Sequence, residues 1–177
     1  MPNSTINLGP DRGTLRVHTY REGIASKLGH DLIIAVDRWQ ATVQVSADGS
    51  PVAVELEADP RSMRVLEGNG LKPLTEKDRG DILNNIDQHV LRGQPIAFRS
   101  HKVDRESERL TVSGDLALAA TTRQATFDLV ISANGRVSGT LPVTQSHWGI
   151  TPFSAPGGVL RLRDTIDVVL DAMLSAG

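Results

Sequence analysis

The sequence predicts an all-β fold, mainly antiparallel, in which about eight strands form a barrel or a sandwich and one amphipathic helix is inserted near residues 75–91. Apolar and polar residues alternate with the two-residue period of a strand through most of the chain. Turn-forming clusters separate these stretches at short intervals, as is typical of all-β domains. Because strands and helices do not alternate, a doubly wound nucleotide-binding fold is not expected.

The first strands are expected in residues 14–20 and 32–45, followed by a turn-forming cluster and a third strand in residues 52–58. Neighbouring residues of a strand point to opposite faces, so each of these strands has one apolar face. In the first strand Leu15 and Val17 share that face. The second and third strands form a hairpin with a loop longer than the shortest type.

Residues 75–91 break the strand pattern. Apolar residues recur there at helical spacing, at Ile82, Ile86 and Val90. Thr75, followed three residues later by Asp78, resembles an arrangement that caps the N-terminus of a helix. A glycine and a proline shortly after the segment end it, so one amphipathic helix is predicted.

Strand patterns return after the helix and continue to the end of the chain. They are expected in residues 96–103, 110–118, 124–132 and 137–143 and from about 159 to 174. The dipeptide Asn134–Gly135 is the strongest hairpin signal in the sequence. No linker or internal repeat divides the chain, so a single domain over residues 1–177 is predicted.

Composition excludes several classes of function. The chain has no cysteine, so it has neither a disulfide nor a thiolate. A formal net charge of -2 and only 3% aromatic residues give neither a field nor stacking platforms for nucleic acid. No signal peptide or membrane-spanning run occurs, so a cytoplasmic protein without membrane insertion is expected.

Catalytic and metal-binding patterns are scarce. No P-loop, nucleophile elbow or paired-histidine zinc motif occurs, so no catalytic residue or cofactor is predicted and the chain is not expected to be an enzyme. His18, His30 and His147 could converge on a metal, with Asp31 as an oxygen ligand. Their long spacings favour histidines that bond to backbone groups instead, and the metal site is kept as a weak alternative.

The apolar faces of the strands have two interpretations. The inward residues either fill a closed core or line a cavity, because an eight-stranded barrel is just wide enough to hold one small ligand. Alternation alone does not separate a filled core from a cavity, and both interpretations stay open at this point.

Several motifs of the chain resemble those of the YceI-like family. Residues 143–153, followed by Asp-Thr-Ile-Asp-Val at 164–168, are similar to a Gln-x-x-aromatic-Gly-Ile stretch and a closing strand. Residues 77–79 and 95–100 are similar to a helix start and to the strand after that helix. The layout of residues 15–45 is similar to the first hairpin of the family, so the resemblance covers nearly the whole chain.

The resemblance implies an extended lipocalin-like barrel of eight antiparallel strands. It also implies binding, transport or storage of an apolar isoprenoid-like lipid, either a polyisoprenoid or the tail of an isoprenoid quinone, and it admits a homodimer. The alternative is a filled-core barrel that acts as an interaction or stress-response module without a small ligand. The implied ligand-binding residues, of which the two Trp and Phe153 would be gatekeepers at a mouth, are Leu15, Val17, Ile34, Val36, Trp39, Val43, Phe98, Leu116, Leu118, Phe127, Leu129, Trp148, Phe153, Val168 and Leu170.

Overall fold

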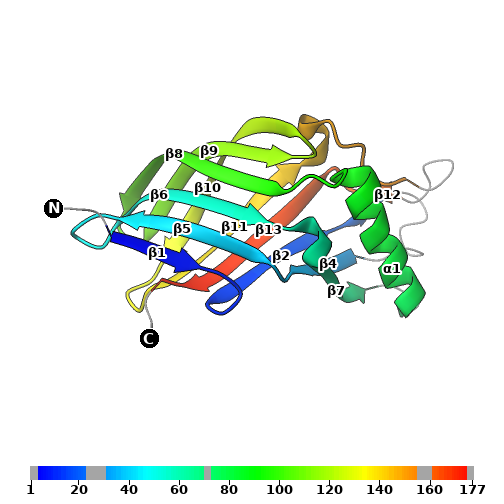
Figure 1. Ribbon diagram of the computed structural model, residues 1–177, viewed down its shortest axis with the longest axis horizontal. Helices are drawn as coiled ribbons and strands as arrows, with labels where there is room; N and C mark the ends of the chain where they lie inside the picture. Colours follow the sequence, from blue (N-terminus) through cyan, green and yellow to red (C-terminus); the bar gives the residue numbers. More distant parts are fainter. Residues whose placement is uncertain (1–3, 23–30, 70–72, 155–160, 175–177) are drawn as a thin grey trace.

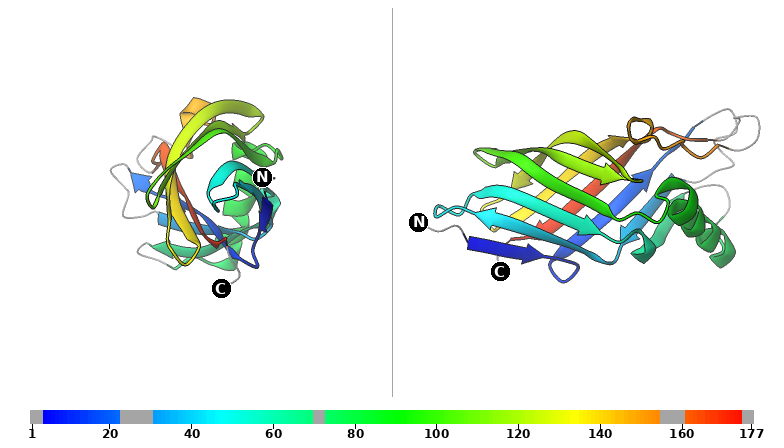
Figure 2. Two further views of the ribbon diagram at one scale, coloured as in Figure 1. Left: turned by 90° about the vertical axis from the view of Figure 1, so that its left-hand side faces the viewer. Right: turned by 45° about the horizontal axis from the view of Figure 1, so that its top comes forward.

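The computed structural model describes residues 4–22, 31–69, 73–154 and 161–174. Within these ranges the antiparallel strands of one strongly curled sheet surround an elongated interior (Figure 2). One α-helix lies across one end of the sheet (Figure 1). The predicted fold class, all-β and mainly antiparallel with one inserted helix, is confirmed.

The curled sheet has 11 strands, and every pairing among them is antiparallel. Two short strands, β3 (Arg21–Glu22) and β12 (Arg161–Leu162), pair with each other beside it. In their order across the sheet, the 11 strands are β1 (Ser4–Leu8), β5 (Trp39–Val45), β6 (Pro51–Ala58), β8 (Ile96–Glu106), β9 (Arg109–Leu118), β10 (Thr121–Ile131), β11 (Arg136–Thr144), β13 (Thr165–Met173), β2 (Gly13–Thr19), β4 (Asp31–Val36) and β7 (Met63–Asn69).

Three pairs of consecutive strands are halves of longer bent segments: β1 with β2, β4 with β5, and β6 with β7. Both halves of the second segment pair with halves of the third, since β5 pairs with β6 and β4 with β7. At this bend the Asp37 N–H donates to the Ser62 carbonyl over 3.1 Å. When each of these three pairs is counted as one segment, the 11 strands form eight segments. These segments follow one another round the interior as the strands of an eight-stranded barrel do.

The predicted helix is present as α1 (Glu76–Asn85), which continues into one π-helical turn, η3 (Ile86–Val90). Its predicted cap is a full capping box: the Thr75 hydroxyl accepts from the Asp78 N–H over 3.1 Å, and the Asp78 carboxylate accepts from the Thr75 N–H over 3.0 Å. The Arg79 guanidinium donates to the Val65 carbonyl of β7 over 2.5 Å. This bond fastens the helix to the strand at the end of the sheet order.

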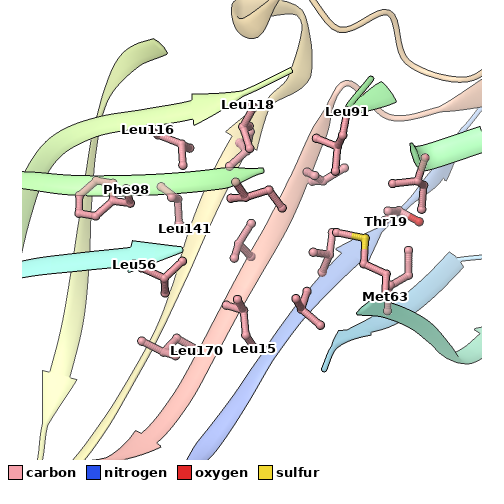
Figure 3. Close-up of a pocket in the computed structure, with 18 of the residues that line it drawn as sticks. Leu15, Thr19, Leu56, Met63, Leu91, Phe98, Leu116, Leu118, Leu141 and Leu170 are labelled. Carbon is pink, nitrogen blue, oxygen red and sulfur yellow. The ribbon is translucent and has the colours of Figure 1, made fainter. Parts of the chain in front are cut away.

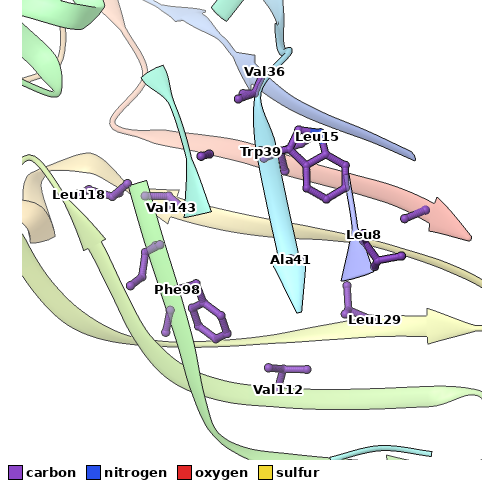
Figure 4. Packing of buried hydrophobic residues seen from close by; sticks show 14 of the residues in the cluster. Leu8, Leu15, Val36, Trp39, Ala41, Phe98, Val112, Leu118, Leu129 and Val143 are labelled. Carbon is purple, nitrogen blue, oxygen red and sulfur yellow. The ribbon is translucent and has the colours of Figure 1, made fainter. Parts of the chain in front are cut away.

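The hydrophobic core is mainly aliphatic and is contributed by strands all round the sheet (Figure 4). Val112 and Val143 are among its most buried side chains. Phe98 and Phe127 pack edge to face with ring centres 5.3 Å apart. These residues lie on alternate positions of β8, β9, β10 and β11, so the period of two in the sequence corresponds to one shared interior.

The close approach of β8 and β9 generates a test of this packing. At Gly114 the register shifts beside a bulge in β8, and an added Cβ atom would overlap the Arg99 carbonyl oxygen and the Ser100 Cα. Gly114→Ala is therefore expected to lower the free energy of unfolding by about 1–3 kcal/mol, measured by urea denaturation. The control is Gly80→Ala in α1, where a Cβ meets no atom within 4 Å.

Gly80→Ala is expected to raise the free energy of unfolding by about 0.5–1 kcal/mol, because alanine is the better helix former. Equal stabilities of the two variants would contradict the close approach of the two strands.

Candidate functional site

The interior of the curled sheet contains a cavity of about 600 Å³ (Figure 3). Small-molecule sites have volumes of about 300–1,000 Å³, so the cavity is of ligand size. All 11 strands contribute to its lining, as do α1 and η3. The apolar residues predicted for the helix, Ile82, Ile86 and Val90, face the cavity from its end.

The inward residues predicted from alternation line this cavity. Thirteen of the fifteen residues implied as ligand-binding take part, and ligand contact at them stays a prediction. They are Leu15, Val17, Ile34, Val36, Val43, Phe98, Leu116, Leu118, Phe127, Leu129, Phe153, Val168 and Leu170.

The structure places both tryptophans outside the cavity lining. Trp39 is buried at the bend between β4 and β5 and borders a separate surface groove with Asp37 and Arg38. Trp148 lies in the 3-10 helix η4 (Gln145–Trp148), and its indole N–H donates to the Leu116 carbonyl over 2.8 Å. Both rings therefore pack within the protein, whereas the third expected gatekeeper, Phe153, lines the cavity and is 49% exposed.

Polar residues of the lining gather at one end of the cavity. They come from the end of β2, from β3 and β12, from α1 and from the start of η4. The start of β13 pairs with β2 and β11, because His18 lies opposite Asp167 and Thr144, just before η4, lies opposite Thr165. The short strands β3 and β12 pair with each other. The rest of the lining is apolar apart from backbone groups. The polar lining residues are Thr19, Arg21, Asp78, Asp81, Asn85, Gln145 and Arg161.

Thr19 is a lining residue that the sequence analysis missed. It ends β2 and continues the inward positions of Leu15 and Val17. Its residue is 7% exposed, and its hydroxyl oxygen is buried without a hydrogen-bond partner in the described part of the chain. The same alternation that located Leu15 and Val17 extends to Thr19, but a polar residue adds nothing to an apolar pattern.

Tyr20, the next residue, holds the end of β2 from outside. Its hydroxyl donates to the Asp167 carboxylate of β13 over 2.6 Å, and the Arg163 N–H donates to its carbonyl over 2.7 Å. The Arg163 guanidinium also lies 5.3 Å from the centre of the Tyr20 ring. The hydrogen bond to Asp167 is the main cause that raises the pKa of Tyr20, and burial of the ring adds to it.

The histidines do not form a metal site in the described structure. His18 lies on the outward side of β2, His147 is exposed in η4, and His30 lies outside the described residues. In residues 4–22, 31–69, 73–154 and 161–174 no three or more His, Asp or Glu side chains are grouped so that they could hold a metal ion. The same ranges contain no helix of the length and apolar character needed to span a membrane.

Comparisons with known proteins agree with this geometry. The sequence model of the YceI-like domain matches residues 32–174. The crystal structure of Burkholderia cenocepacia BcnA is similar, with 12% identity, a TM-score of 0.66, and coverage of 91% of this chain and 96% of that one. That of the Campylobacter jejuni YceI protein has 12% identity, a TM-score of 0.55, and coverages of 80% and 84%. No curated protein matches in sequence.

The contact between Tyr20 and Asp167 predicts an altered titration. Tyr20 is the one tyrosine of the sequence, so ultraviolet absorbance against pH reports it alone. Its midpoint is expected above 10.0, and Asp167→Ala should shift the midpoint back toward that value. Asp171→Ala on the same strand, where Asp171 pairs with Arg136, is the control and should leave it unchanged.

The same shift fixes the sign of the effect on stability. The folded state favours the protonated phenol of Tyr20. Its contribution to the free energy of unfolding is therefore complete below the unfolded-state pKa and is lost as pH rises through the folded-state pKa. A wild-type midpoint at or below 10.0 would contradict the hydrogen bond.

Proposed function

Because this chain belongs to the YceI-like family, we propose that it binds an apolar isoprenoid-like lipid inside the curled sheet and carries or stores it without catalysis. A polyisoprenoid or the tail of an isoprenoid quinone fits this description. The single observation that carries the proposal is the apolar cavity of about 600 Å³, which strands from the whole ring enclose.

The size of the cavity supports a ligand with a long chain. If a methylene-sized group occupies roughly the 30 Å³ that a water molecule takes in the liquid, the cavity accommodates about 20 such groups. Each buried CH₂ contributes about 0.8 kcal/mol, so a chain of this length outweighs the usual cost of association. An isoprenoid tail has no polar group to satisfy, which suits walls made of Leu, Val, Ile and Phe.

The cavity weighs against the alternative of a filled-core interaction module. Such a barrel would use its inward side chains to fill the interior. Here all three phenylalanines of the sequence already line the cavity, and both tryptophans pack elsewhere. The remaining inward residues are too small to close the space, so occupation by a ligand accounts for it better.

A bulky side chain on the inner face tests the proposal. Leu141 of β11 is half-buried and borders the cavity, so Leu141→Trp fills part of the open space. The affinity of this variant for geranylgeraniol is expected to fall by at least about tenfold, because the new indole ring occupies part of the cavity volume that the ligand needs. Native mass spectrometry and calorimetric titration measure the loss.

The matched control is Val130→Trp in β10. Val130 is 51% exposed and does not line the cavity, so this variant should bind as the wild type does. The proposal fails when wild-type protein takes up no geranylgeraniol, or when both tryptophan variants bind it equally well.

A further inference from the structure

The Thr19 hydroxyl stands out among the groups that face the cavity. Thr19 is only 7% exposed, and its hydroxyl oxygen has no hydrogen-bond partner among the described residues. Buried polar atoms in native proteins nearly always have a partner, so an unpaired one that borders a cavity indicates a group supplied from the cavity.

The surroundings of Thr19 define where that group would lie. Figure 3 shows Thr19 at the side of the cavity toward α1, and in the pairing of β2 with β4 it lies opposite Leu32. Leu32 is apolar and buried and also lines the cavity, so it offers no side-chain donor or acceptor. The position belongs to the end of the cavity where the polar lining residues gather, whereas Leu15 and Val17 continue the apolar wall along the same strand.

We propose that the Thr19 Oγ1 hydrogen-bonds a neutral oxygen, a hydroxyl or a carbonyl, at one end of the isoprenoid chain. The ligand then lies with its oxygen toward α1 and its tail along the apolar walls of the barrel. This inference rests on the proposed function and narrows the ligand to a neutral oxygen-bearing isoprenoid, such as a polyprenol or a quinone.

Charges at this end favour a neutral group over a phosphate. Asp81 of α1 lines the cavity there and would repel an anion. The two lining arginines already have carboxylate partners: Arg161 pairs with Glu22 over 2.9 Å, and Arg21 lies 3.8 Å from Asp31. A neutral oxygen needs only the one hydrogen bond that Thr19 offers.

The test uses three ligands and matched variants. The ligands are geranylgeraniol and the hydrocarbon in which hydrogen replaces its hydroxyl, and geranylgeranyl phosphate is the charged comparison. Thr19→Val keeps the shape of the side chain and removes the hydroxyl, whereas Thr19→Ser keeps the hydroxyl. Thr140→Val, on an exposed residue of β11 that does not line the cavity, is the control. Calorimetric titration gives each affinity.

Thr19→Val is expected to weaken geranylgeraniol binding about two- to tenfold without weakening that of the hydrocarbon, as loss of one hydrogen bond predicts. Thr19→Ser and Thr140→Val should keep the wild-type preference, and the phosphate should bind no better than the alcohol.

Two results would overturn the inference and leave the proposed function intact. One is a Thr19→Val variant whose affinities for alcohol and hydrocarbon change equally, and the other is tighter binding of the phosphate. Wild-type protein that binds none of the three ligands would overturn the proposed function, and the inference with it.

Discussion

Alternation of side chains along paired strands is the constraint on which this structure depends. Register places Val17 of β2 beside Ile34 of β4 on one side and beside Val168 of β13 on the other, and all three line the cavity. A slip of one residue in β2 would turn Arg16 and His18 inward and expose the apolar set. The large cost of burying those groups fixes the register, and the register fixes the wall of the cavity.

The interior stays open because the tryptophans and the tyrosine lie outside the cavity lining. The indole N–H of Trp148 donates to the Leu116 carbonyl, and the Tyr20 hydroxyl donates to the Asp167 carboxylate. Phe98 and Phe127 pack against each other within the wall. With mainly aliphatic residues on the other inward positions, a ring of this circumference encloses more volume than its side chains fill.

The sequence predicted most of the strands, the helix and the apolar wall, because each rests on local periodicity. It did not predict β1 and β7 or the bends that halve the long segments, which depend on pairing between distant residues such as Asp37 and Ser62. Trp39 shares the alternation of its strand, yet its place at a bend directs it to another surface. Thr19 also fits the alternation, but its place in the cavity lining was not predicted because only apolar residues were assigned to inward positions.

The helix is the element whose packing depends most on what the cavity contains. No residue of α1 is buried, and Ile82 is half-buried with open volume beside it, as is Ile86 of η3. Among the described residues, the hydrogen bond from Arg79 to the Val65 carbonyl attaches α1 to the sheet. An apolar molecule in the cavity removes these isoleucines from water, so the free energy of binding also stabilises the docked helix. By the same linkage, a helix held firmly in place would strengthen the binding of such a molecule, so α1 would be coupled to the cavity that the strands enclose.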